Sequence, residues 1–275
     1  NYIIFASFFL VLITALEDLY FDISPLSRLI SILLIATIFF YNQNIQLPHF
    51  NINILNFEVT SEIFLFFFYV MCVTVMTNGM NLIDGTNGNS ILNFIFFVTA
   101  LLIVTNEINF NQFNIFLVSL LTVSIPFLMF NFPLGRIFLG DCGAYLLGFV
   151  VSLLIIYFYS LNSNFSPYGA ILIIFYPIFE TFFSYFRKTV QGKSPVYPDK
   201  FHLHLMIFGI YKKKFSIEKS NNLTTITLIP VSVLGPLLFI LFYENEIAIM
   251  ISTIFLIIFY AIYYLTAFKK CKNFR

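Results

Sequence analysis

The chain has too little charge for a soluble domain and too few cysteines for a disulfide framework. Charged residues make up 10% of its 275 residues, hydrophobic residues 60%, and the mean hydropathy is +0.92, whereas soluble domains carry about 25% charged residues. Tryptophan is absent, and the three cysteines are an odd number without a motif spacing. The net charge of +1 says nothing about nucleic acid, and no basic stripe interleaved with aromatic residues supports it, so no nucleic-acid partner is expected. The composition predicts a membrane protein.

Long apolar runs predict an all-α polytopic membrane fold. A spanning helix needs about 20 mostly apolar residues. The chain offers nine segments near that length: 1–16, 29–41, 63–76, 90–105, 114–130, 143–160, 168–184, 223–242 and 246–268. The shortest, 29–41, has a re-entrant segment as its alternative reading. We expect one integral membrane domain over residues 1–275. Further helices are expected upstream, because Asn1 already lies within an apolar run.

Lysine and arginine are confined to alternate connections. All 14 lie in 17–28, 77–89, 131–142, 185–222 and 269–275. Basic loops remain in the cytoplasm, so these connections are expected there, and the connection 42–62, which lacks them, favours a crossing by 29–41. The segment 185–222 is expected to be a long functional loop. Within it, residues 205–211 predict a short interfacial helix followed by lysines near anionic headgroups.

The sequence around Asn78 carries polar groups where a helix meets the membrane edge. Asn78, Asn81 and Asp84 recur at i, i+3 and i+6, and Gly85 and Gly88 allow the backbone to turn sharply. A simple Asx-Gly turn accounts for the end of this stretch but not for amides at membrane depth, which are costly and usually functional. We therefore predict a site here.

Two acidic groups lie on the same side of the membrane. Glu17 and Asp18 close the first helix, and Asp22 shares a helical face with Asp18 at i+4; a solvated helix end is the alternative. Asp141 begins the sixth segment, where free N–H groups favour anions. A carboxylate at that place suits Mg²⁺ together with a phosphate, whereas an ordinary N-cap is the other interpretation.

Two of the three histidines, His202 and His204, lie two residues apart in the long loop. This spacing places both on one face of an extended segment but on nearly opposite sides of a helix. Zinc ligation is weakly supported, because no cysteine or third histidine lies nearby.

Together these motifs resemble the polyprenyl-phosphate N-acetylhexosamine-1-phosphate transferases. That family includes phospho-N-acetylmuramoyl-pentapeptide transferase and the undecaprenyl-phosphate GlcNAc-1-phosphate transferases. The likeness consists of an acidic pair (Glu17-Asp18), an Asn-x-x-Asn-x-x-Asp-Gly-x-Asp-Gly stretch (78–88), an asparagine (Asn131) ahead of a Phe-Met-Gly-Asp-x-Gly turn (138–143), and a histidine motif (202–204). The motifs occur in the family's order and span nearly the whole chain.

The resemblance implies transfer of a sugar 1-phosphate from a UDP-sugar to polyprenyl phosphate, with release of UMP. It implies Mg²⁺, with Mn²⁺ as the alternative, a place in the bacterial cytoplasmic membrane, a role in starting cell wall or lipopolysaccharide glycans, and a homodimer as one expected assembly. It also implies roles for individual residues: Asp141 and Asp18 at the metal, Glu17 beside them, Asp84, Asn78, Asn81 and Asn87 around the nucleotide, Asn131 and Phe138 holding and stacking on the uracil, and His202 and His204 at the diphosphate.

The chain departs from the family pattern at several places. Glu17 replaces an aspartate, Asn87 replaces a carboxylate, and Leu205 stands where many members have another histidine. The His-Leu-His form favours the N-acetylhexosamine branch over the muramoyl-pentapeptide branch. An upstream Pro-Arg-Gly-Gly-like motif is absent together with about two helices, so a longer protein is expected to be needed for activity.

Two other functions predict different arrangements of the acidic residues. An ion-coupled transporter predicts carboxylates near the bilayer midplane and paired broken helices. A CDP-alcohol phosphotransferase predicts several aspartates at i, i+3 or i+4 within one region, whereas these acids are spread over four loops. For the transferase, the acceptor phosphate is mostly dianionic near neutral pH, its second pKa being about 6, so a general base is dispensable. We expect Asp18 to position the acceptor or join the metal shell; in the competing mechanism it deprotonates the lipid phosphate.

Overall fold

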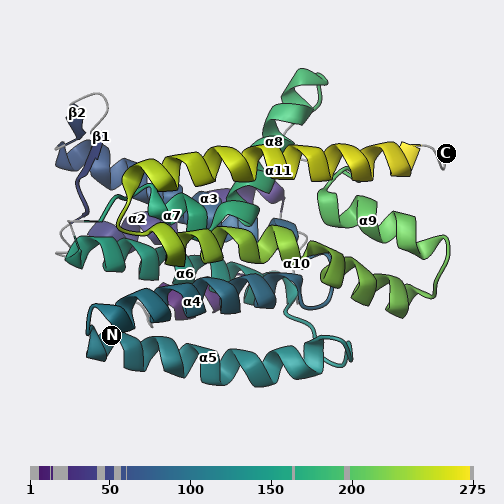
Figure 1. The fold of residues 1–275 in the computed structure, drawn as a ribbon, viewed down its shortest axis with the longest axis horizontal. Helices are drawn as coiled ribbons and strands as arrows, with labels where there is room; N and C mark the ends of the chain where they lie inside the picture. The colour runs from purple at the N-terminus through teal and green to yellow at the C-terminus, as the bar shows by residue number, and fades with distance from the viewer. Residues whose placement is uncertain are drawn as a thin grey trace.

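The structure, a computed structural model, describes residues 6–12, 14, 24–41, 47–52, 57–59, 61–162, 165–194 and 199–272. These residues form helices and one short β-hairpin, which confirms the all-α polytopic class (Figure 1). In chain order the elements are α2 (Pro25–Tyr41), β1 (Phe50–Ile52), β2 (Phe57–Val59), α3 (Glu62–Ile83), α4 (Asn89–Glu107), α5 (Asn111–Asn131), α6 (Gly140–Leu161), α7 (Gly169–Ile173), α8 (Phe175–Val190), α9 (Leu203–Lys212), α10 (Ile217–Phe242) and α11 (Glu246–Lys272). The two strands pair antiparallel.

Six of the described helices, α3, α4, α5, α6, α10 and α11, are long and apolar enough to cross a membrane. Helix α2 has 17 residues, a rise of about 25 Å. Arg28, near its first residue, contacts Asp141 at the start of α6. Beyond its other end, the carbonyl of Pro48 accepts a hydrogen bond from Tyr69 in the first half of α3. The two ends of α2 therefore lie at opposite ends of the bundle, in agreement with a crossing by 29–41.

The segment expected as one helix over 168–184 is broken. Helix α7 ends at Ile173, Ile174 departs from helical geometry, and α8 then projects from the bundle (Figure 1). Pro177 in the first turn of α8 has no N–H to donate to the carbonyl four residues before it, so a continuous helix would lose a hydrogen bond there. The break sends α8 in a new direction.

The expected loop 185–222 is mostly helical. Helix α8 continues to Val190, and α10 begins at Ile217 rather than near 223. Between them lies α9, which corresponds to the predicted short helix and begins two residues earlier than expected. Its Leu203, Met206 and Ile207 are buried, so the helix packs on the bundle instead of lying free at the membrane surface.

Helix α3 packs closely on α6 at the centre of the bundle. A Cβ atom on Gly148 of α6 would lie 2.7 Å from the Cα of Thr77 and 2.8 Å from the carbonyl oxygen of Met76. Between membrane helices, small residues allow such close approach and dispersion contacts supply the attraction. Large buried rings, among them Phe94, Phe97 and Phe158, belong to the larger of two hydrophobic clusters in the bundle.

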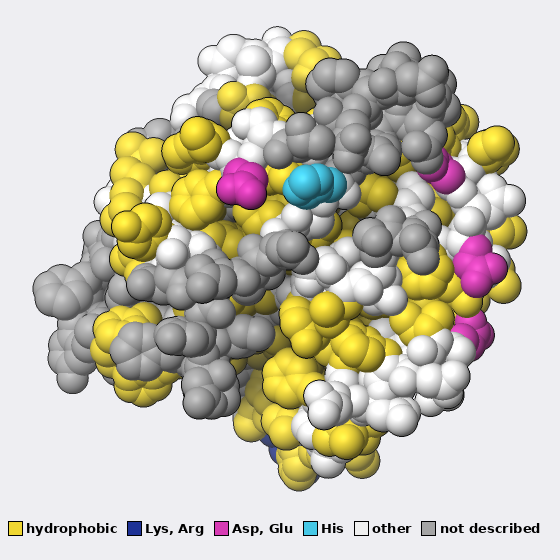
Figure 2. All heavy atoms as spheres, turned by 90° about the vertical axis from the view of Figure 1, so that its left-hand side faces the viewer, with side chains coloured by type: hydrophobic (Ala, Val, Ile, Leu, Met, Phe, Trp, Pro, Cys, Tyr) yellow, Lys and Arg dark blue, Asp and Glu magenta, His cyan; other side chains and the backbone are white. Residues whose placement is uncertain are grey.

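The predicted sidedness appears as two unlike ends of the bundle. We call the end that carries the α3–α4 and α5–α6 connections, α9 and the first turns of α10 the basic end; it lies at the right of Figure 1, beside the C-terminus. Figure 2 looks onto the opposite end, where acidic side chains and a histidine are visible among the coloured atoms and lysine or arginine is nearly absent. Such asymmetry is the pattern that basic cytoplasmic loops produce.

Replacement of Gly148 by alanine is expected to loosen the α3–α6 contact. The added methyl group would meet α3 backbone, and overpacking of this kind costs roughly 1–3 kcal/mol. Gly209 of α9 provides the matched control, because a Cβ there meets nothing within 4 Å and alanine favours helix. Thermal unfolding in detergent should show a lower Tm for Gly148→Ala and an equal or higher Tm for Gly209→Ala. Equal Tm values for Gly148→Ala and the wild type would contradict this packing.

Candidate active site

Polar residues at the start of α4 tie down the end of α3. Ser90 Oγ donates to the carbonyl of Met80 (3.0 Å), and Asn89 Nδ2 donates to that of Ile83 (2.6 Å). These carbonyls lie in the last turn of α3, where no following N–H exists to satisfy them. Asp84, the residue after α3, is therefore presented from a fixed backbone.

Asp141 lies beside this turn because three separate segments meet there. Asn81 Nδ2 donates to Oδ1 of Asp141 (2.9 Å), and Arg28 Nη1 donates to Oδ2 (2.5 Å). The Asp141 side chain remains 40% exposed, so it is held by two partners and still open on one side. Two residues predicted to share a site, Asn81 and Asp141, are thus in direct contact.

The ionised form of Asp84 is disfavoured by its surroundings. Burial raises its pKa to about 7, a hydrogen bond from Ser90 opposes the rise, and the nearby charge of Asp141 adds to it. Two carboxylates whose charges repel one another in a partly buried site favour a cation between or beside them.

Asn131 joins the α3–α4 and α5–α6 connections. Its Oδ1 accepts from the backbone N–H of Gly88 (2.6 Å), and its Nδ2 donates to the carbonyl of Ile137 (2.7 Å). Gly88 has φ of +85°, a conformation that favours glycine. Asn131 is buried, whereas Phe138 is 71% exposed. The uracil-holding role of Asn131 and Phe138 stays a prediction; in this structure Asn131 connects two turns and Phe138 is free to meet a ligand.

Helix α10 holds the same two connections from the side, and the sequence did not indicate this. Asn221 Oδ1 accepts from the N–H of Asn87 (2.8 Å), and Thr225 Oγ1 donates to the carbonyl of Asn87 (2.6 Å). Asn222 Nδ2 donates to the carbonyl of Pro133 (3.0 Å). The available signal was a run of polar residues in an otherwise apolar helix. Asn78, also predicted for the nucleotide, lies half-buried in α3.

The two motif histidines meet the α3–α4 connection. His202 is the residue before α9 and His204 lies in its first turn, and their rings stack with centroids 5.9 Å apart and planes 15° apart. A Cβ on Gly85 would lie 2.1 Å from Nε2 of His204, so the imidazole lies directly on the glycine backbone. Burial lowers the pKa of His204 to about 4, which makes it a neutral ring near pH 7, and its buried Nδ1 has no hydrogen-bond partner among the described residues.

A second network behind the histidines was missed by sequence reasoning. Glu180 of α8, 1% exposed, accepts hydrogen bonds from His202, from the N–H of Leu203 and from Tyr260 of α11. Arg187, about two turns further along the same face of α8, forms two hydrogen bonds with Asp199. The signal was an acidic residue inside an apolar segment, which usually has a functional reason.

The site's oxygen donors fit Mg²⁺. Among the residues that the structure describes, no three His, Cys, Asp or Glu side chains gather as a metal cage. Mg²⁺ needs fewer, since it is usually bound by one or two carboxylates plus substrate phosphates. Asp141, exposed on one side, with Asp84 close enough to repel it, supplies such a donor set. Glu17, Asp18 and Asp22 lie outside the described residues, so their predicted part in the site stays a prediction.

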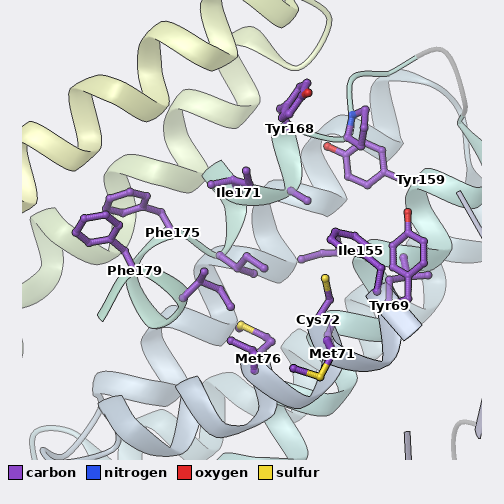
Figure 3. A pocket seen from close by; sticks show the side chains of 18 of the residues that line it. Tyr69, Met71, Cys72, Met76, Ile155, Tyr159, Tyr168, Ile171, Phe175 and Phe179 are labelled. Carbon is purple, nitrogen blue, oxygen red and sulfur yellow. The ribbon is translucent and has the colours of Figure 1, made fainter. Parts of the chain in front are cut away.

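An apolar cavity of about 660 Å³ lies elsewhere in the bundle, between α3, α6, α7, α8 and α11 (Figure 3). Its walls include Met76, Ile155, Ile171, Phe175 and Phe179. None of the predicted site residues lines it. Its chemistry suits hydrocarbon and not a nucleotide.

Substitution of Asp84 by asparagine is expected to stabilise the metal-free protein at alkaline pH. The unfolded chain ionises near the ordinary value of 3.8, while the folded protein keeps Asp84 protonated until about pH 7. Folded-state stability is therefore lost as the pH rises between these values. With a chelator present, Asp84→Asn should raise Tm by several degrees at pH 8, by clearly less at pH 5 and by little at pH 4. The control Glu62→Gln, at an exposed position in the same helix, should change none of these values. An Asp84→Asn effect independent of pH would refute the assignment.

Gly85→Ala is expected to displace His204. The methyl group would occupy space now filled by the imidazole, and only movement of the ring or of the turn relieves the overlap. Thermal unfolding in detergent should show a clearly lower Tm for Gly85→Ala and a wild-type or higher Tm for Gly209→Ala, whose added methyl group meets nothing. An unchanged Tm in Gly85→Ala would show that this contact is unimportant.

Three relatives illustrate what the chain is similar to. It is 37% identical over 90 residues to a probable undecaprenyl-phosphate N-acetylglucosaminyl 1-phosphate transferase of Bacillus subtilis, a stretch covering 32% of this chain and 25% of the relative. It is 35% identical over 80 residues to an undecaprenyl-phosphate alpha-N-acetylglucosaminyl 1-phosphate transferase of Thermotoga maritima (29% and 26% covered), and 32% identical over 94 residues to the protein of that name from Escherichia coli K12 (32% and 26%). The matched stretches span about a quarter of each relative.

The family comparison extends further along the chain. The model of glycosyl transferase family 4 matches residues 1–159, which is more than half of the 275 residues. That range includes Asp84 and Asp141, whose charges interact at the basic end, and Asn131, which accepts a hydrogen bond from Gly88 in the same α3–α4 connection. The chain belongs to glycosyl transferase family 4.

Proposed function

We propose that this membrane protein transfers an N-acetylhexosamine 1-phosphate from a UDP-sugar to undecaprenyl or a related polyprenyl phosphate, releasing UMP. It would act at the cytoplasmic face of a bacterial membrane and start a cell-envelope glycan. The observation that carries the proposal is the meeting of Asp84, Asp141 and His204, from three distant parts of the chain, around one turn at the basic end. Membership of family 4 and the names of the relatives support the same reaction.

In the proposed reaction an oxygen of the lipid phosphate attacks the phosphorus attached to the sugar. A new P–O bond forms, the P–O bond to UMP breaks, and UMP leaves with its electron pair. Because the acceptor phosphate is mostly dianionic near neutral pH, no side chain has to remove a proton. Phosphoryl transfer depends mainly on positioning and electrostatics, and we assign those tasks to the residues of this site.

Mg²⁺, with Mn²⁺ as the alternative, would be held by Asp141 and Asp18 and would neutralise charge on the diphosphate. Two neighbouring side chains hold the carboxylate of Asp141 in place. Asn81 fixes one oxygen of Asp141, and Arg28 contacts the other and brings a positive charge to the place where two anions must meet. His204, a neutral ring with an unused buried nitrogen, is suited to a hydrogen bond with a phosphate oxygen.

The lipid chain of the acceptor needs an apolar place at membrane depth. The cavity of Figure 3 is lined almost wholly by apolar side chains, and Phe175 and Phe179 on its wall belong to α8, the helix that also carries Glu180. We assign part of the prenyl chain to this cavity.

An ion-coupled transporter remains the alternative, and the break between α7 and α8 is the observation in its favour. Asp84 and Asp141 lie at helix ends instead of mid-helix, which favours the transferase. Cation-driven uptake without UMP release would identify the transporter.

The proposal is tested by UMP release from a panel of UDP-sugars with undecaprenyl phosphate, using the full-length protein. Release is expected only with a divalent cation present. Asp141→Asn should lower the rate at least about 100-fold, the scale on which lost charge stabilisation acts. Glu218→Gln, an exposed acidic position in α10, should leave the rate unchanged. A folded protein that releases no UMP from any donor would overturn the proposal.

A further inference from the structure

We propose that Glu180 is the positioning residue of the histidine motif. It holds His202 and the first turn of α9 so that His204 stays against the Asp84–Gly85 turn. The inference rests on the proposed function and adds to it a residue on a helix that projects from the bundle.

Glu180 is a buried carboxylate, and both of its oxygens accept hydrogen bonds. Its side chain is 1% exposed, and a buried carboxylate is tolerated only when its oxygens are hydrogen-bonded. Oε1 accepts from His202 Nδ1 (3.0 Å) and from the N–H of Leu203 (3.2 Å), and Oε2 accepts from the hydroxyl of Tyr260. These donors come from the connection before α9, from α9 itself and from α11. Glu180 therefore connects three elements through one carboxylate.

These contacts fix both the orientation and the tautomer of His202. An ionised carboxylate only accepts hydrogen bonds, so the proton of the imidazole lies on Nδ1, toward Glu180. Nε2 faces Asp199 Oδ1 at 3.6 Å. Asp199 is in turn held by Arg187 and by the N–H of Phe201. Because Glu180 and Arg187 both belong to α8, this one helix determines how the ring is oriented.

The position of His204 depends on that of His202. The two rings are stacked, and the backbone between them is anchored by the hydrogen bond from Leu203 to Glu180. His204 lies on Gly85, beside Asp84, and its buried Nδ1 lacks a partner among the described residues. A nitrogen left unsatisfied in that way is costly and points to a ligand atom that completes it. Loss of Glu180 would free His202 to rotate and remove the support behind His204.

The decisive variant is Glu180→Gln, which keeps the shape and an acceptor oxygen but removes the negative charge. Loss of a hydrogen-bond partner that orients a site histidine from behind typically lowers activity by about 10–100-fold. We expect kcat to fall by about that factor while KM for the UDP-sugar changes by less than about threefold, because the predicted uracil contacts lie elsewhere. Tyr260→Phe removes one donor and leaves the bond to His202, so its loss should be smaller. Glu218→Gln serves as the control and should match the wild type.

A spectroscopic measurement separates positioning from mere structural support. In protein labelled with ¹⁵N-histidine, the wild type should show one imidazole locked with its proton on Nδ1, and Glu180→Gln, whose neutral oxygen is a weaker acceptor, should shift the resonances of that imidazole. If Glu180→Gln fails to fold, Asp199→Asn, at the other ring nitrogen, should alter the same signal and lower kcat in the same direction. Unchanged spectra and an unchanged kcat in a folded Glu180→Gln protein would overturn the inference.

The two proposals fail in different ways. Absence of UMP release from the wild type would reject the proposed transferase, whereas the ¹⁵N signature would still report whether Glu180 orients His202. A wild type that is active, together with a Glu180→Gln variant of equal kcat, would reject only the positioning role.

Discussion

The hydrogen bond from Asn81 to Asp141 is the interaction on which the rest of the site depends. It joins the end of α3 to the start of α6, two helices that Gly148 allows to pack backbone to backbone. Arg28 adds α2 to the same carboxylate. Since charged groups at a membrane edge are costly unless paired, this contact both stabilises the bundle end and leaves Asp141 oriented for chemistry.

Around that contact, apolar helices contribute single polar residues that hold the active-site connections. Asn221 and Thr225 of α10 fix Asn87, and Glu180 of α8 fixes His202. In hydrocarbon no water is available to hydrogen-bond a polar group. Each of these residues therefore hydrogen-bonds to a protein partner, and the same bond positions that partner. Stability of the fold and geometry of the site thus arise from the same hydrogen bonds.

Much of the fold followed from hydropathy and charge, and much of the site from motifs. The spans corresponding to α4, α5, α6 and α11 match the predicted segments to within about four residues at each end, whereas α3 continues to Ile83, seven residues beyond the predicted end at 76. The break at Ile174 and the early start of α10 were not predicted. Hydropathy averaged over a window of residues has the same value for a kinked helix and for a straight one. Asp84, Asp141 and His204 were predicted and lie together. Arg28 and Glu180 were missed because each stands alone in its segment, and Asn221 was missed because the polar run around it matches no motif.

By itself the sequence determined that the chain crosses a membrane many times and which connections share a side. It also identified the polar residues that lie at membrane depth. These residues stand out because charged and polar groups are costly in hydrocarbon and are usually kept there for function. Only the tertiary structure decided which polar residue pairs with which. Asn131 connects two turns, His204 rests on Gly85, and α8 reaches back to hold the histidines through Glu180. Such pairings join residues up to 139 positions apart, and their geometry depends on helix packing, which no local pattern encodes.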